Sequence, residues 1–245
     1  MLNGTAELAA IEREAPTVNS FDTAPVVLEH VELLQLLYEI DCGALQTLLP
    51  PALHPTLPPV VAWSVYRVSE SPWGAFQLAQ ARIECRSGLR PRGYLLGGLI
   101  DNETAAAALA RGWGYRLRPG TPQLRRNYHE IRARVFQDRS LVLDLALRNP
   151  IPLAPRDLQF VASMHPAHTP LGFRLVQVEP NHDATRAERG APHVMRFAPT
   201  AVGAAQVELT CPISAMFCLA SVTIPPVRYV CRPDVSAFEG TERLR

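Results

Sequence analysis

The sequence predicts a single α+β domain built around a closed or nearly closed β-sheet. Many short segments rich in β-branched and aromatic residues are separated by turn residues, whereas few segments have a helical pattern. No internal repeat or long linker divides the 245 residues. A chain of this length can bury a substantial core, so one large β-rich domain is sufficient to account for it.

The expected elements follow the chain in order. We expect a flexible polar arm over residues 1–24, one domain over residues 25–234 and a polar tail over residues 235–245. Asp41 is expected to cap a short helix over residues 43–48. The remaining expectations are strands over residues 26–28, 32–40, 60–68, 75–86, 94–100, 129–136, 140–147, 159–163, 172–178, 193–197, 204–209 and 227–231, and a helical segment over residues 214–221.

Residues 99–124 form the stretch most suggestive of a functional site. Either Asp101 or Asn102 can cap an alanine-rich helix here, and that helix is expected to end at Gly112–Gly114. The loop that follows contains the bulky side chains from Tyr115 to Arg118. A loop held by rigid elements commonly delivers side chains to a pocket.

The expected strand over residues 75–86 carries polar groups on both of its faces. Cys85 lies on the face opposite Leu78, which argues against a cysteine nucleophile in a cavity beside Leu78. Polar groups on both faces fit a strand in a barrel better than a surface ribbon. The face that includes Leu78 contains Phe76, Leu78, Gln80, Arg82 and Glu84.

The overall charge gives no indication of a nucleic-acid or membrane partner. The net charge is +1 and the pI is near 7.7, so there is no strong global field. No apolar run approaches the roughly 20 residues that a membrane-spanning helix needs. Glu7, Glu12 and Glu14 interrupt any apolar N-terminal segment, so we expect no signal peptide and a cytoplasmic location.

All 24 basic residues are arginine, because the sequence contains no lysine. A Schiff base on a side-chain amine is therefore excluded, since a guanidinium stays protonated and is a poor nucleophile. The five cysteines form no C-x-x-C pair, and Pro166 separates His165 from His168 without a third ligand nearby. No metal site is expected, and no phosphate loop or nucleotide motif indicates a cofactor.

Three segments of the chain resemble the acetoacetate decarboxylase family. They are D-N-E-T-A-A-A from Asp101, L-Y-E-I-D-C-G-A-L-Q-T-L-L-P-P-A-L from Leu37 to Leu53, and V-E-P-N-H-D from Val178 to Asp183. The resemblance covers about residues 30–232. It implies a cone-shaped β-barrel with an interior pocket, a few flanking helices and a homo-oligomer, a dimer or larger.

The loop that carries the chemistry of this family is changed here. Its best-known members use a Schiff-base lysine in a G-[FY]-P-K-K loop, with the second lysine lowering the pKa of the first. Laid on this sequence, the loop is Gly114–Arg118. The resemblance then places Leu117 at the nucleophile and Arg118 at the neighbouring lysine.

Other pocket positions of the family are also changed. Its two pocket glutamates fall on Leu78 and Trp63, and its N-terminal arginine falls near Val31. An apolar and aromatic pocket is expected, because charged side chains of the family are replaced by Val, Leu and Trp at these positions. Each large buried apolar side chain offers about 1.5–3 kcal/mol of burial energy to a ligand or to the core. Such a pocket fits a larger hydrophobic molecule better than a small keto acid.

Arg118 is the predicted catalytic residue, as an anchor for an anion or for developing negative charge. The alternative is an arginine on a surface loop. Trp63 can stack on a substrate or simply fill the barrel, and Tyr115 can donate a hydrogen bond or be a core tyrosine. One of Gln80, Arg82 and Glu84 can reach the cavity, or the three can form a paired polar network at its rim. The predicted substrate-binding set is Val31, Trp63, Leu78, Gln80, Tyr115 and Leu117.

The leading functional hypothesis is a cofactor-independent enzyme of specialised, polyketide-like metabolism. It would bind an extended apolar small molecule and promote cyclisation, cycloaddition or dehydration by holding the substrate in a reactive shape. One alternative is a non-catalytic protein that binds a hydrophobic ligand. Another is a lysine-independent decarboxylase, hydratase or aldolase that acts on small oxo acids, with Arg118 as the anchor.

Overall fold

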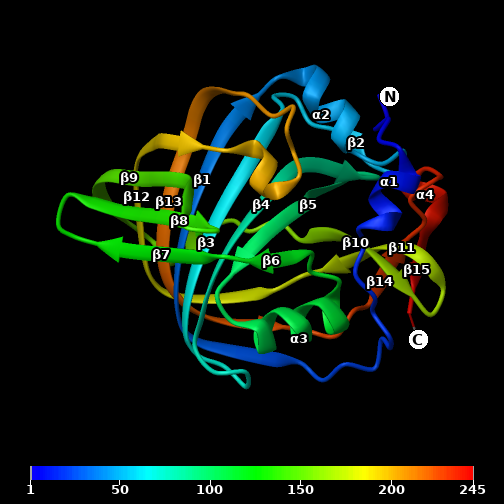
Figure 1. The fold of residues 1–245 in the computed structure, drawn as a ribbon, viewed down its shortest axis with the longest axis horizontal. Helices are drawn as coiled ribbons and strands as arrows, with labels where there is room; N and C mark the ends of the chain where they lie inside the picture. The colour runs from blue at the N-terminus through cyan, green and yellow to red at the C-terminus, as the bar shows by residue number, and fades with distance from the viewer. Residues whose placement is uncertain (1, 245) are drawn as a thin grey trace.

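The computed structural model describes residues 2–244 as a strongly curved sheet with short helices on its outside (Figure 1). The α-helices are α1 (Leu8–Arg13), α2 (Cys42–Leu48), α3 (Glu103–Trp113) and α4 (Ala237–Gly240). The strands are β1 (Val26–Ile40), β2 (His54–Pro55), β3 (Val60–Glu70), β4 (Phe76–Ser87), β5 (Arg90–Ile100), β6 (Leu117–Pro119), β7 (Thr121–Arg126), β8 (Glu130–Gln137), β9 (Ser140–Leu153), β10 (Ser163–Thr169), β11 (Gly172–Val178), β12 (Asn181–Phe197), β13 (Leu209–Ile224), β14 (Tyr229–Cys231) and β15 (Thr241–Arg243).

The strands of the described chain form one sheet in the order β15-β14-β11-β10-β5-β4-β3-β1-β13-β12-β9-β8-β7, with β2 beside β4 and β6 beside β5. The backbone ladder does not close. Side chains bridge the gap where β7 turns back toward β3 and β4. Gln77 Oε1 accepts a hydrogen bond from the Leu124 amide at 3.1 Å, and Arg67 Nη1 donates to the Leu124 carbonyl at 3.5 Å. The predicted α+β class, with a double sheet and few helices, is confirmed.

Two hydrophobic cores lie on opposite faces of the central strands. We call the cluster that contains Trp63, Ala79, Ile131 and Phe217 the first core, and the cluster that contains Leu78 the second core. The central strands are covered on both faces, so side chains that alternate along β4 enter the two cores in turn. The two faces expected for this strand are confirmed.

Helix α3 covers the second core, and Asn102 is its cap. The Asn102 side chain accepts a hydrogen bond from the Ala105 amide at 2.9 Å and donates to the carbonyls of Trp73 and Ala75, each at 3.1 Å. Asp101 instead accepts a hydrogen bond from the backbone amide of Gln77. The structure therefore selects Asn102 from the two residues that the sequence offered as caps.

Some expected elements are wrong. The segment 214–221 is part of the strand β13 and is not helical. Its two faces pack in the two cores, so its sequence lacks the alternation of polar and apolar residues that would have indicated a strand. Residues 204–208 form no strand, and β10 begins at Ser163 rather than at residue 159. The strand β12 is much longer than the expected 193–197.

The N-terminal arm contains helix α1 and contacts the domain. The Gly4 amide donates to the Leu53 carbonyl at 2.9 Å, the Val18 amide donates to the His168 carbonyl at 2.8 Å, and Val18 is fully buried. The expected flexibility of the arm stays a prediction. The tail holds α4 and β15. No helix within residues 2–244 has both the length and the apolar character needed to cross a bilayer.

Candidate functional site

An interior cavity lies within the second core, beneath helix α3. Its volume is about 30 Å³, close to that of one water molecule. Its walls come from β1, β3, β4, α3, Tyr115, β12 and β13, so the curved sheet and one helix together enclose it. The lining residues are Leu28, Tyr66, Val68, Phe76, Leu78, Gln80, Leu109, Tyr115, Pro180, His182, Val222 and Ile224.

Four polar side chains interrupt this apolar lining: Tyr66, Gln80, Tyr115 and His182. Gln80 Nε2 lies 3.3 Å from the Tyr66 hydroxyl, and Gln80 Oε1 is buried without a partner. Both ring nitrogens of His182 are also buried without a hydrogen bond, although the ring stacks on Phe160 with centroids 3.8 Å apart. Buried polar atoms without partners are uncommon, so the cavity offers hydrogen-bonding capacity to a ligand.

Arg82 does not line the cavity itself but follows Gln80 by two positions on the same face of β4. The side chain is buried, and its Nη2 donates to Ser64 Oγ at 3.2 Å. Its Nε has no partner, and no carboxylate within residues 2–244 lies within 4.0 Å of the guanidinium. Glu84, two positions further along β4, interacts with this charge at longer range, because Arg82 opposes the rise that burial causes in the pKa of Glu84. The guanidinium therefore has no direct ion pair, which makes its burial costly.

The charge of Arg82 acts on the polar groups of the cavity. Burial raises the pKa values of Tyr66 and Tyr115, and the positive charge of Arg82 opposes both shifts. Burial, and to a smaller degree the charge of Arg82, lowers the pKa of His182 to about 4, and the Pro180 carbonyl opposes this shift. At neutral pH both tyrosines are therefore hydroxyl donors and His182 is uncharged.

A second histidine lies close to this group. His165 Nδ1 is 2.8 Å from the Trp113 carbonyl and its Nε2 is 2.8 Å from Ser163 Oγ. The carbonyl can only accept, so Nδ1 carries the proton and Nε2 accepts from Ser163. Burial lowers the pKa of His165 to about 3, and the Tyr115 ring packs edge-on against it at 4.3 Å. His165 therefore fixes the position of Tyr115.

Five of the predicted site residues lie together in the second core: Val31, Leu78, Gln80, Tyr115 and Leu117. Leu78, Gln80 and Tyr115 line the cavity. Val31 and Leu117 pack in the same core but do not line the cavity. Leu117 pairs with Gly98, whose missing side chain leaves room for Leu117 Cδ2.

Trp63 and Arg118 lie elsewhere. Trp63 lies in the first core, with its ring 4.9 Å from that of Phe197. Side chains alternate along a strand, so its neighbour Ser64, and not Trp63, shares the face of Gln80. The Arg118 side chain is 43% exposed and pairs with Glu14 at 3.4 Å. The structure does not bring these two residues to the interior cavity.

Three polar residues near the cavity were not singled out from the sequence. Tyr66 and Ser64 lie on β3, where extending the alternation from Val68 toward the N-terminus would have placed them on the cavity face. His182 stood alone in the sequence, and only the fold brings it opposite Gln80. No local pattern identifies a contact of that kind.

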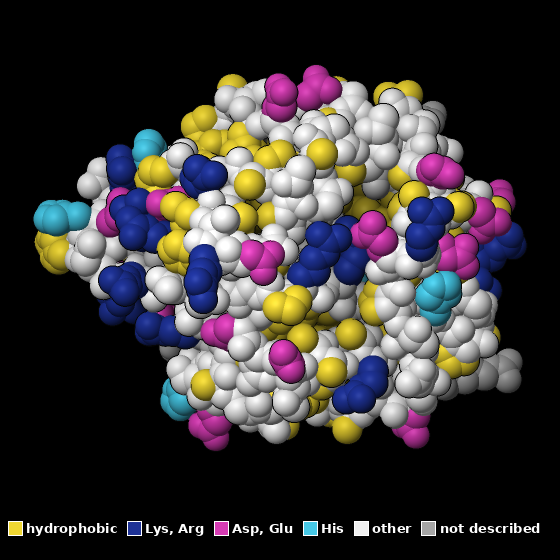
Figure 2. Space-filling model, viewed as in Figure 1, with side chains coloured by type: hydrophobic (Ala, Val, Ile, Leu, Met, Phe, Trp, Pro, Cys, Tyr) yellow, Lys and Arg dark blue, Asp and Glu magenta, His cyan; other side chains and the backbone are white. Residues whose placement is uncertain are grey.

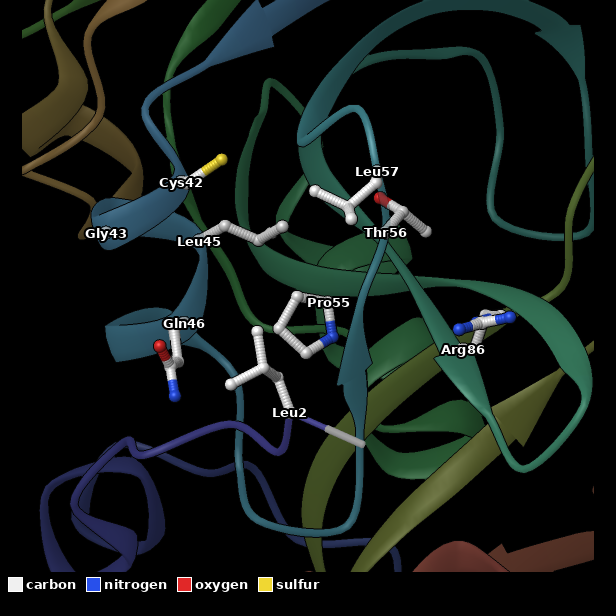
Figure 3. Close-up of a pocket in the computed structure, with 9 residues that line it drawn as sticks. All are labelled: Leu2, Cys42, Gly43, Leu45, Gln46, Pro55, Thr56, Leu57 and Arg86. Atoms are coloured by element: carbon white, nitrogen blue, oxygen red, sulfur yellow. The ribbon is translucent and has the colours of Figure 1, made fainter.

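A separate surface groove lies between the N-terminal segment, α2 and β2 (Figure 3). It holds the exposed free thiol of Cys42 and the side chain of Arg86, while Leu2, Leu45 and Leu57 give it an apolar wall. None of the predicted site residues lines it. It contains no paired acid and base, so the interior cavity is the better candidate for chemistry.

The fold is that of an α+β protein in which the curved sheet and helix α3 surround an interior cavity. The family model for acetoacetate decarboxylase (ADC) matches residues 14–235, and the chain belongs to this family. A search of curated proteins found no match.

Solved structures of similar fold agree with this assignment. Acetoacetate decarboxylase from Legionella pneumophila is 16% identical, with a TM-score of 0.74 over 87% of this chain and 88% of that chain. The enduracididine biosynthesis enzyme MppR complexed with pyruvate is 14% identical, with a TM-score of 0.69 over 84% and 90%. An acetoacetate decarboxylase-like enzyme from Sphingomonas wittichii is 17% identical, with a TM-score of 0.66 over 84% and 92%. At identities this low, the structural similarity establishes the shared fold and nothing more.

Proposed function

We propose that the protein is a cofactor-independent enzyme that cyclises or dehydrates a small natural-product intermediate in the interior cavity. The observation that carries this proposal is the buried Arg82, which has a hydroxyl neighbour but no carboxylate partner. A substrate with a carboxylate or an enolisable carbonyl would supply the missing negative charge. Stabilising charge that develops in a water-poor site is commonly the largest contribution to catalysis.

The proposed chemistry uses an enolate in place of a Schiff base, because the chain has no lysine. Neutral His182 takes a proton from the carbon next to the substrate carbonyl. Arg82 and the hydroxyls of Tyr66 and Tyr115 stabilise the resulting enolate oxygen. In a dehydration, the proton leaves His182 with the departing hydroxide as water; in a cyclisation, it returns to the product and the mass is unchanged.

The lining of the cavity limits the substrate. Its volume of about 30 Å³ is far below the range of about 300–1,000 Å³ typical of small-molecule sites, so the lining side chains must move apart when a substrate enters. The apolar walls suit a hydrocarbon body, and the polar groups suit one oxygen-bearing end. The proposed substrate is therefore compact, or an extended chain folded back on itself. Holding such a chain in a reactive shape contributes about 7–11 kcal/mol in the best cases.

The test is incubation of the protein with linear β-keto and β-hydroxy precursors, followed by mass spectrometry. A product of unchanged mass with a new retention time supports cyclisation, and loss of water supports dehydration. Arg82→Gln is expected to lower turnover by at least about 100-fold, because it removes a charge-stabilising donor. Arg118→Gln is the matched control and is expected to leave turnover unchanged. The reverse pattern would assign the anchor to Arg118 and reject this mechanism.

A second candidate is lysine-independent chemistry on a small oxo acid. The unpaired Arg82 and the limited cavity volume both favour a compact carboxylate, and one protein of similar fold is named as a complex with pyruvate. Loss of carbon dioxide from an oxo acid, or its condensation with an aldehyde, would select this candidate. Tight binding of a precursor without any change in its mass would instead indicate a non-catalytic carrier.

A further inference from the structure

We propose that a surface hollow beside the turn between β7 and β8 is a phosphate-binding site, separate from the interior cavity. Arg126, Arg186 and Glu188 line it together with residues of that turn and of β9. Glu188 pairs across the sheet with Phe217 of the first core, whereas His182 pairs with Val222 of the second core. The hollow and the cavity therefore lie on opposite faces of β12.

The three charged residues make an unequal set of contacts. Glu188 Oε1 accepts from Arg126 Nη2 at 2.7 Å and from Arg186 Nη2 and Nε at 2.6 and 3.1 Å. The Glu188 side chain is only 7% exposed, and its other oxygen, Oε2, is buried without a hydrogen-bond partner. Two guanidinium groups share one carboxylate, so the cluster keeps a net positive charge that an oxyanion can neutralise.

The hydrogen-bond donors of the hollow are held in place before any ligand binds. Asn127 Oδ1 accepts from the amides of His129 and Glu130, which leaves Nδ2 as the free donor. The Arg126 guanidinium lies 5.5 Å from the centre of the Phe217 ring. The remaining N–H groups of Arg126 and Arg186 bond to no residue within 2–244. Preorganised donors lower the entropic cost of binding.

The unpaired Glu188 Oε2 selects the kind of oxyanion. As a buried acceptor, it requires a donor from the ligand. Phosphate near neutral pH carries a P–OH group that can donate to Oε2 while its other oxygens accept from the arginines. Sulfate and simple carboxylates are fully deprotonated at that pH and offer no such donor. Figure 2 also shows arginine side chains gathered over this end of the molecule, where β7, β8 and β9 lie in Figure 1.

The experiment is isothermal titration calorimetry of the full chain with inorganic phosphate at pH 7 in a chloride buffer, with sulfate in parallel. Phosphate is expected to bind at least about tenfold more tightly than sulfate. Arg186→Gln is expected to weaken phosphate binding at least about tenfold, and Arg186→Lys to weaken it in the same direction because the planar fork is lost. Arg189→Gln, on an exposed residue of the same strand, is the control and is expected to change binding by less than about twofold.

Glu188→Gln tests the selection step separately, with circular dichroism to verify that the variant is folded. The amide can donate to sulfate, so the preference for phosphate is expected to disappear. A titration with glycerol phosphate distinguishes the source of the ligand, because an ester with a second pKa near about 6 has mostly lost its P–OH group at pH 7. Weaker binding than inorganic phosphate indicates the free ion, and equal or tighter binding indicates a phosphate ester. Absence of phosphate binding, or equal binding by wild type and Arg186→Gln, would overturn the proposal. Equal binding of phosphate and sulfate by the wild type would overturn the role of Glu188.

Discussion

Arg82 is the residue at which stability and function are expected to oppose each other. Its buried cation has a single hydroxyl neighbour, Ser64, and no ion pair with residues 2–244. Removing the charge relieves a desolvation cost of several kcal/mol and sacrifices one hydrogen bond of about 1 kcal/mol. The first effect is larger, so the native residue is retained at a cost to folding. Binding of an anionic substrate, as proposed above, would explain why such a residue persists.

Arg82→Met should therefore raise the free energy of unfolding by about 1–3 kcal/mol while abolishing turnover. Urea denaturation followed by circular dichroism measures the first effect, and the precursor assay measures the second. Arg118→Met serves as the control at an exposed arginine, with an expected change within about 0.5 kcal/mol. A loss of stability in Arg82→Met would mean that the guanidinium has a compensating partner, and would remove the argument for an absent anion.

The two buried histidines predict how stability depends on pH. Burial lowers the pKa of His165 to about 3 and that of His182 to about 4, whereas an unfolded histidine titrates near about 6.5. Below about pH 6.5 the unfolded chain binds protons that the folded chain does not, so stability is complete above that pH and falls as the pH decreases. Each histidine contributes up to about 1.4 kcal/mol per pH unit.

Urea denaturation at intervals from pH 7 to pH 4.5 measures this slope. His182→Phe keeps an aromatic ring against Phe160 and removes one titrating group, so its slope is expected to be shallower than that of the wild type. Exposed His129 provides the control, because His129→Gln should leave the slope unchanged. A wild-type stability that does not vary between pH 6.5 and 5 would contradict the burial of both imidazoles.

At the scale of the element, helix α3 depends on a single amide side chain. Asn102 caps the helix through the Ala105 amide and also ties it to the turn before β4 through the carbonyls of Trp73 and Ala75. Asn102→Ala removes all three contacts and should cost about 1–2 kcal/mol. A thermal melt measures the cost, and Asn102→Asp should recover the cap but not the two donated bonds. If Asn102→Ala melts with the wild type, the helix does not rely on this cap.

The elements that could be predicted from sequence are those with a local signal. The cap of α2, the two faces of β4 and the helix α3 each follow from residues adjacent in the chain. The strand β13 could not be assigned because it packs on both faces and shows an apolar run without alternation. The strand β12 contains Gly190 and Pro192, which interrupt the pattern that would have revealed its length.

The candidate site shows the same division between local and distant information. Leu78, Gln80 and Tyr115 line the cavity, and family motifs or strand alternation are the local signals that point to them. Trp63 was placed one position from the cavity face, which is enough to move a side chain into the other core. His182 reaches the cavity from a distant strand, and a single sequence carries no signal for that contact.

At the scale of the whole molecule, two cores share one set of central strands, and this arrangement places the interior cavity and the arginine-lined hollow on different sides of the sheet. The second core encloses the cavity with Arg82 at its side, whereas the outer end near the first core carries the arginine-lined hollow. A ligand at either place contacts β12, on opposite faces. A pocket that is apolar except for donors and one cation can hold an enolate without covalent attachment.

The fold also allows a direct test of whether the absence of a lysine at position 117 is what prevents Schiff-base formation. Leu117 pairs with Gly98 and packs in the second core, whereas Arg118 is exposed. The chain contains no lysine, so a single introduced lysine is the one side-chain amine that borohydride can trap as an imine. Leu117→Lys is expected to be labelled by an oxo acid and borohydride at neutral pH, because partial burial against the second core lowers the pKa of an amine.

Arg118→Lys is the matched control, since an exposed lysine keeps its usual pKa and should be labelled only at high pH. Peptide mapping by mass spectrometry locates the adduct and separates it from labelling of the N-terminal amine. Equal labelling of the two variants would mean that position 117 has no access to the cavity. Selective labelling of Leu117→Lys would show that the interior site still admits an oxo acid, and that the missing amine, rather than the shape of the pocket, prevents Schiff-base chemistry in this protein.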